Sequence, residues 1–145
     1  RQRQMCIRDS NSMPAYVVDR ASRLLNKEKK ALNGSKVLLL GVTYKPDIAD
    51  QRQSPAVPVA ERFLDYGTEL MFHDPFVEEW NVSDDPTSRD VLLKREQDLD
   101  KAVSEADLVV LLQRHSEYDI PGLSDRARIF FDTVGVTQGD ITHRL

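Results

Sequence analysis

Two cations and a candidate helix N-terminus lie close together in one polar segment, which follows an apolar run that ends at Val42. The cations are Lys45 and Arg52, and Ser54-Pro55 comes directly after them. Serine is favoured at a helix N-cap and proline at the first helical position. Lysine acts on an anion as a mobile point charge, arginine grips phosphate with two hydrogen bonds, and a helix N-terminus offers free N–H groups. The segment therefore predicts a site that stabilises anionic oxygens.

The residues alone leave a second interpretation of this segment equally open, namely a charged surface loop that only caps a helix. Asp47 and Asp50 fit either interpretation, since each could orient a cation through a charged hydrogen bond. The segment also lacks the G-x-G-x-x-G fingerprint, so it does not indicate that this part of the chain binds a nicotinamide dinucleotide by itself.

Other candidate residues are more isolated. His73 and Asp74 could act as a base and its orienting carboxylate, or as metal ligands, but a turn that leaves a strand is favoured for Asp74-Pro75. The three histidines of the chain are too widely separated to predict a metal site, so none is expected. His115 follows a predicted strand, where either a ligand contact or a solvated loop position is reasonable. Trp80 could stack on a base, but ordinary packing is favoured.

Composition excludes several classes of function. The formal net charge is −4 and the sequence pI about 5.4, whereas general binders of nucleic acids or anionic membranes are usually basic. No apolar run approaches the roughly 20 residues that span a bilayer. Cys6 is the only cysteine, so an intrachain disulfide is impossible and a reducing compartment, the cytoplasm, is expected. We interpret Cys6 as a free thiol rather than a nucleophile, because no base or oxyanion site is apparent beside it.

The elements that must position these residues alternate between strand and helix patterns. Short apolar runs predict buried strands at 36–42, 68–72, 108–112 and 128–132. Apolar residues at helical spacing predict helices from Pro14 to Asn33-Gly34, from Ser54-Pro55 to Gly67, and over 99–105, with a helical turn at 115–119. Residues 78–97 are polar and are expected to form loops.

This alternation predicts an α/β fold: a Rossmann-like open parallel sheet with helices on both faces, in three layers. Residues 1–12 are expected to be a disordered or foreign leader, 13–35 a helix that enters from another domain, and 36–145 the Rossmann-like domain. Ligands of such sheets bind beyond the carboxyl ends of the strands, so the polar residues after Val42, Phe72, Leu112 and Phe131 are the places to examine.

Three stretches carry a resemblance to a known family. They are MPAYVV at 13–18, GSKVLLLGVTYKPDIADQRQSPA at 34–56 and GTELMFHDPFV at 67–77. Together they resemble the C-terminal, UDP-binding domain of the UDP-glucose/GDP-mannose dehydrogenase family, over about residues 13–132. The most specific part is the pattern G-x-x-Y-K-x-x-x-x-D-x-R-x-S-P, which starts at Gly41.

The resemblance implies a function for the whole enzyme and a smaller one for this chain. Members of the family use NAD to oxidise the C6 alcohol of a nucleotide sugar to a carboxylate, in polysaccharide biosynthesis among other routes. The resemblance implies that NAD is held mainly by an N-terminal domain, and that a central domain carries the catalytic cysteine and the homodimer contact. The sequence contains neither the dinucleotide fingerprint nor a G-G-x-C-F-P-K-D segment. We therefore expect this chain to bind a UDP-sugar together with the remainder of the dehydrogenase, and to contain no catalytic residue itself.

Specific roles follow from the resemblance, residue by residue. Lys45 is expected near the UDP phosphates and sugar, Tyr44 in the wall of the nucleotide site, and Arg52 towards NAD across the domain interface. Asp50 and Ser54 match the motif, but are expected to hold the loop and cap the helix. The motif leans towards UDP-N-acetylhexosamines, with UDP-glucose also open.

One departure from the family pattern supports an alternative. Many members carry D-x-R after the last strand, whereas this chain has Asp132-Thr133-Val134, with a valine in the place of the arginine. The alternative function is a non-catalytic interaction or regulatory module that has kept the fold without the ligand.

Overall fold

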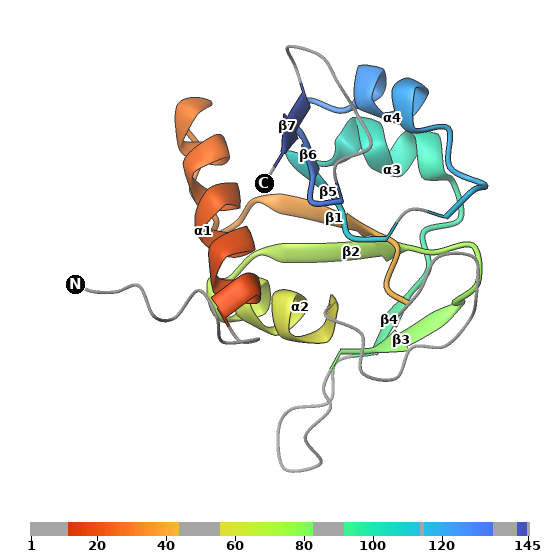
Figure 1. The fold of residues 1–145 in the computed structure, drawn as a ribbon. Coiled ribbons are helices and arrows are strands. Elements are labelled where there is room, and N and C mark those ends of the chain that lie inside the picture. The colour runs from red at the N-terminus through yellow and green to blue at the C-terminus, as the bar shows by residue number, and fades with distance from the viewer. Residues whose placement is uncertain (1–11, 44–55, 83–91, 114, 135–141, 145) are drawn as a thin grey trace.

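A parallel sheet forms the centre of the chain (Figure 1). The computed structural model describes residues 12–43, 56–82, 92–113, 115–134 and 142–144. Each strand of the sheet pairs in parallel with its neighbours, in the order β2-β1-β5-β6-β7. The bounds are Lys36–Leu40 for β1, Glu69–His73 for β2, Leu108–Leu111 for β5, Phe130–Asp132 for β6 and Thr142–Arg144 for β7.

Helices cover both faces of this sheet, which confirms the predicted three-layer α/β fold (Figure 1). The helices α1 (Ser12–Lys27) and α2 (Ala56–Asp65) pack on one face. On the other face lie α3 (Leu99–Glu105), whose bounds match the prediction, and α4 (Ile120–Arg126). Within the described part of the chain, no helix is both long and apolar enough to cross a membrane.

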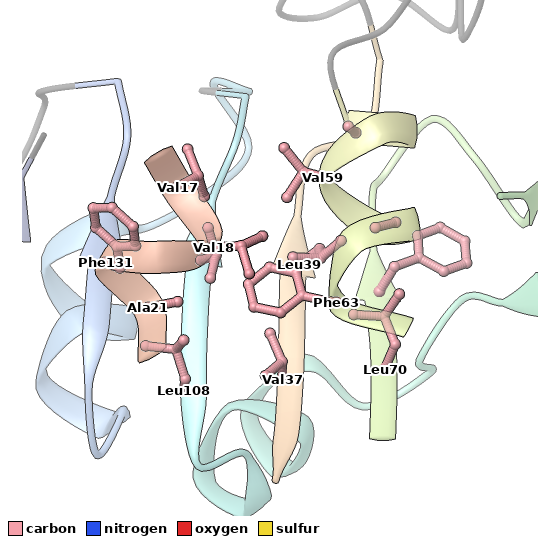
Figure 2. Close-up of a cluster of buried hydrophobic side chains, with 14 of the residues drawn as sticks. Val17, Val18, Ala21, Val37, Leu39, Val59, Phe63, Leu70, Leu108 and Phe131 are labelled. Carbon is pink, nitrogen blue, oxygen red and sulfur yellow. The ribbon is translucent and has the colours of Figure 1, made fainter. Parts of the chain in front are cut away.

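The central strands β1 and β5 are apolar almost throughout because each contributes to two cores. In β1, Val37 and Leu39 point towards α1 and α2, whereas Leu38 and Leu40 belong to the cluster beneath α3 and α4. Figure 2 shows the cluster on the side of α1 and α2, in which Phe63 of α2 lies beside β1. A strand alternates its side chains between the two faces of the sheet, so burial of both faces requires a continuous apolar run.

The first helix is shorter than the sequence predicts. It ends at Lys27, and the chain turns there through hydrogen bonds from Lys29 N to Asn26 O (2.9 Å) and from Lys30 N to Leu25 O (3.0 Å). This is a Schellman arrangement, in which the turning residue adopts a left-handed conformation. That residue is Lys29, with a φ of 63°. The prediction of an end at Asn33-Gly34 was wrong because the usual glycine signal is missing at the actual end.

The segment expected to be loop contains an antiparallel strand pair, β3 (Glu79–Asn81) and β4 (Leu92–Lys94). The pair covers part of the first core, because Trp80 in β3 is 1% exposed and its ring lies edge-on to Phe72 of β2, with centroids 5.5 Å apart. The packing interpretation of Trp80 is therefore confirmed.

Short elements account for the other differences. The predicted turn at 115–119 is present as one hydrogen-bonded turn, with Tyr118 N 3.1 Å from His115 O. The helix α4 then begins at Ile120, after an N-cap at Asp119, and was missed because only a few apolar residues mark it. Neither β7 nor the β3–β4 pair was predicted, because these three-residue strands lie in polar stretches of the sequence. The strand β6 has the same length, but it lies in the predicted apolar run at 128–132.

An ion-pair cluster joins three connections at the amino edge of the sheet, where the strands begin. Asp107 Oδ1 lies 2.6 Å from Lys30 Nζ and 3.3 Å from Arg128 Nη1. Its Oδ2 accepts a hydrogen bond from Lys36 N at 2.9 Å. Burial by itself would raise the pKa of Asp107, but the hydrogen bonds from Lys30 and Lys36 and the charges of Lys30 and Arg128 lower it overall. The cluster therefore favours the ionised carboxylate.

Candidate functional site

The direction of the chain through the sheet reverses between β1 and β5. From β1 the chain passes to β2 on one side, whereas β5 lies on the other side and leads on to β6 and β7. Counted among the strands of the sheet, this order is 2-1-3-4-5, a doubly wound arrangement whose ligands bind at the carboxyl ends of the two strands that flank the reversal. The candidate site therefore lies where β1 and β5 end.

The two strand ends approach each other closely at Gly41, directly after β1. A Cβ atom placed on Gly41 would lie 2.5 Å from the carbonyl oxygen of Gln113, and the backbone φ of Gly41 is +81°. Glycine is needed there on both counts, because other residues rarely adopt this conformation and none would fit the space. The side chain of Gln113 also reaches back, with Nε2 3.3 Å from the Thr43 carbonyl oxygen.

A buried carboxylate lies beneath this edge. Asp74 directly follows β2 and is 0% exposed. Its Oδ2 accepts a hydrogen bond from Val42 N at 2.8 Å and lies 2.8 Å from Nε2 of His115, while its Oδ1 accepts from Phe76 N at 2.8 Å. Buried charges are tolerated in proteins when they are paired and hydrogen-bonded in this way. Asp74 therefore links the ends of β1, β2 and β5.

His115 is also buried, with 1% of its surface exposed. Besides Asp74, its Nε2 lies 3.3 Å from the Thr43 hydroxyl, and its ring contacts those of Phe76 and Tyr118, at centroid distances of 5.0 Å and 5.9 Å. Since an ionised carboxylate only accepts hydrogen bonds, Nε2 carries the hydrogen that faces Asp74. Of the two alternatives for His115, the solvated loop position was wrong, because the side chain is buried.

The neighbouring His73 has a different set of partners. Tyr118 donates its hydroxyl hydrogen to the His73 carbonyl oxygen at 2.8 Å, and the same hydroxyl oxygen lies 3.1 Å from His73 Nδ1. Burial and the positive charge of Arg95 lower the pKa of His73, although Asp74 opposes them. Burial and the charge of Asp74 raise the pKa of Tyr118. The suggested pairing of His73 with the Asp74 carboxylate is not observed, because that carboxylate contacts His115.

The predicted site residues Tyr44, Lys45 and Arg52 lie outside the described residues, as do Asp50 and Ser54. The residues on either side of this segment are described. Thr43 stands at the end of β1 with its side chain beside His115, and α2 begins at Ala56. The predicted loop site after β1 therefore stays a prediction, and sequence reasoning missed the Asp74–His115 pair. The available signal was that Thr43, Asp74 and His115 each follow closely after a predicted strand.

The segment after β6 also reaches this edge. Asp132 is 0% exposed, and its Oδ1 accepts a hydrogen bond from Val134 N at 2.8 Å. The Thr133 hydroxyl donates to the Leu111 carbonyl oxygen at 2.6 Å, which joins the ends of β5 and β6. Val134 itself is 39% exposed, so a side chain at this position reaches the surface without disturbing the core. Among the described residues, no group of three or more histidine, cysteine, aspartate or glutamate side chains could hold a metal ion.

Comparison with known proteins identifies the family of the chain. Residues 38–139 match the model of the UDP-glucose/GDP-mannose dehydrogenase family, UDP binding domain. The chain is 29% identical over 140 residues to a UDP-N-acetyl-D-mannosamine dehydrogenase of Methanocaldococcus jannaschii, which covers 91% of this chain and 29% of that protein. It is 32% identical over 133 residues to the enzyme of the same name from Salmonella typhi, covering 88% of this chain and 30% of that protein.

A solved structure of a similarly named enzyme also resembles this chain. The UDP-N-acetyl-mannosamine dehydrogenase of Staphylococcus aureus superposes with a TM-score of 0.68 at 32% identity, over 92% of this chain and 30% of that structure. The chain thus spans less than a third of the length of these relatives. With its family model matched over most of its length, this chain belongs to the UDP-glucose/GDP-mannose dehydrogenase family and corresponds to the UDP-binding domain of that family.

Proposed function

We propose that the chain binds the UDP portion of a nucleotide sugar at the carboxyl ends of β1 and β5, as one part of a longer NAD-dependent dehydrogenase. The observation that carries this proposal is that the expected ligand site of the sheet and the family match fall on the same residues of the chain. The reversal between β1 and β5, where doubly wound sheets bind ligands, falls inside the region that matches the UDP-binding family model.

In this proposal, the segment that follows Thr43 in the sequence would supply the groups that contact the nucleotide. Lys45 would neutralise the pyrophosphate, Tyr44 would form part of the wall around the nucleotide, and Arg52 would extend towards NAD. These roles fit the chemistry of the residues, because a lysine serves as a point charge for phosphate and an arginine as a bidentate donor. The buried Asp74–His115 pair would lie beneath the loop and support it from the core.

In the longer protein, we propose that the reaction is the oxidation of the sugar C6 alcohol to a carboxylate. This is a four-electron oxidation, so two NAD molecules would each accept one hydride, and water would supply the second carboxylate oxygen. NAD would be held mainly by a separate domain, because the turn after β1 lacks the glycine fingerprint of dinucleotide sites. The names of the relatives favour a UDP-N-acetylhexosamine such as UDP-N-acetyl-D-mannosamine as the substrate. A homodimer in the cytoplasm, working in polysaccharide biosynthesis, would follow from the same resemblance.

The test is calorimetric titration of UDP into the full-length protein, with Lys45→Ala as the variant. We expect UDP affinity to fall about tenfold or more, because a charged hydrogen bond to phosphate contributes roughly 1.5–3 kcal/mol. Lys27→Ala is the matched control, since Lys27 is exposed at the far end of α1 and should leave UDP affinity unchanged. If the wild-type protein does not bind UDP, or if Lys45→Ala binds it as tightly as the wild type, the proposed site is wrong.

A further inference from the structure

We infer that Asp74 and His115 are positioning residues, which hold the exit of β1 in the conformation that the nucleotide site requires. This inference rests on the proposed function, since it assigns the buried pair a part in UDP binding rather than in folding alone. Neither residue is expected to touch the ligand, because both side chains are inaccessible to solvent.

The first step of the argument is where the pair is anchored. Asp74 follows β2, and its Oδ2 accepts from the N–H of Val42, the second residue after β1. The same oxygen contacts Nε2 of His115, which follows β5. One carboxylate oxygen thus joins segments that follow three adjacent strands. The chain that leaves Val42 reaches Lys45 only three residues later, so the position of Val42 constrains where that cation can lie.

The second step is that the two side chains depend on each other. Phe76 N occupies the other carboxylate oxygen, at 2.8 Å. Arg95 does not contact the carboxylate in this arrangement. Its guanidinium donates to the backbone carbonyl oxygens of Asp74 and Pro75, at 3.3 Å and 3.2 Å. Removal of the His115 donor would therefore leave Asp74 as a buried carboxylate with a missing partner, which favours rearrangement or entry of water.

The third step is that the rearrangement would reach the proposed ligand site first. Val42 and Thr43 share contacts with the pair through the Val42 N–H and the Thr43 hydroxyl, which lies 3.3 Å from His115 Nε2. The strands contribute side chains to two large apolar clusters, in which Val42 is only one of many buried members. Loss of the pair should therefore displace the exit of β1 while the sheet remains folded, which reduces UDP affinity without abolishing the fold.

The experiment compares two neutral amides at the same position in the full-length protein. Glutamine is long enough to place an N–H near the position of the histidine Nε2, whereas asparagine ends near the position of Nδ1 and cannot reach Asp74. We expect His115→Asn to weaken UDP binding by about tenfold, the size expected for an unpaired buried group. His115→Gln should keep UDP affinity within about threefold of the wild type. The affinity for NAD, which a separate domain is proposed to hold mainly, should fall less than the affinity for UDP in His115→Asn and should stay unchanged in His115→Gln.

Hydrogen exchange of the wild type gives a second readout that needs no variant. If the pair and the ligand site are coupled, bound UDP must increase the protection of the Val42 amide, because coupling between two sites is reciprocal. The inference is overturned if His115→Asn and His115→Gln bind UDP equally well, or if both lose UDP and NAD binding together. Should His115→Asn fail to fold, unchanged exchange at Val42 on UDP binding would overturn it instead. Failure of the wild type to bind UDP would refute the proposed function itself, and this is a separate result.

Discussion

Replacement of Gly41 by alanine should destabilise the chain much more than the same replacement at Gly34, although the two backbones are nearly alike. The φ angles are +81° at Gly41 and +83° at Gly34. A left-handed conformation costs an alanine about 1–2 kcal/mol relative to glycine, and both variants incur this cost. The surroundings differ, since a Cβ at Gly34 would have no atom within 4 Å.

At Gly41, the added Cβ would lie 2.5 Å from the carbonyl oxygen and 2.9 Å from the nitrogen of Gln113. These are backbone atoms, and the chain there is tied to β1 by a hydrogen bond from Leu112 N to Leu40 O at 2.8 Å. Relief of the clash requires the ends of β1 and β5 to separate, which strains that bond. Overpacking of this kind costs about 1–3 kcal/mol. We therefore expect Gly41→Ala to lose about 2–5 kcal/mol and Gly34→Ala about 1–2 kcal/mol.

The assay is urea denaturation followed by the fluorescence of Trp80, the only tryptophan of the chain, which is buried against Phe72 of β2. The difference between the two variants isolates the steric contribution, because the conformational cost is common to both. Equal stabilities for Gly41→Ala and Gly34→Ala would refute the conclusion that β1 and β5 approach closely at this edge. In the full-length protein, Gly41→Ala should also weaken UDP binding, whereas Gly34→Ala should not.

Two further changes test the amino edge and the strand pair. Asp107→Asn should lower the free energy of unfolding at neutral pH by about 1 kcal/mol, because its cationic partners are partly exposed. The pKa of Asp107 is lowered from its ordinary value of 3.8, so the stability that the carboxylate contributes is fully present above that value and is lost as pH falls through the lowered pKa. The stabilities of wild type and variant should thus converge as the pH falls below the ordinary value of 3.8, and a difference that does not shrink with falling pH would contradict the ionic origin. Trp80→Phe should cost only about 1 kcal/mol, compared with roughly 3–5 kcal/mol for Trp80→Ala. The buried indole Nε1 has no hydrogen-bond partner within the described structure, so its removal offsets part of the lost packing. Circular dichroism would follow this pair of variants, and equal losses for phenylalanine and alanine would count against the explanation.

Much of the fold can be read from apolar periodicity. The runs after Lys36, after Thr68 and from Leu108 are each followed by a polar or glycine residue, and each forms a strand of the sheet. Strands buried on both faces must be apolar at every position, so the pattern is strong even over a few residues. The end of α1, the strand β7 and the β3–β4 pair were not predictable in the same way, because Lys29 turns the helix without a glycine signal and these short strands lie in polar sequence.

The candidate site was also predictable from the sequence only in part. The sequence alone determined that a segment with two cations follows a buried strand, and the residues of that segment were sufficient to indicate the family. Only the tertiary structure decided that Asp74 pairs with His115, 41 residues away, and that Gly41 faces Gln113. Local patterns indicate which apolar residues are buried, but the burial and the partner of a polar side chain depend on which strands lie side by side. That order is set by the crossovers of the sheet, which bring the ends of β1, β2 and β5 to a single edge.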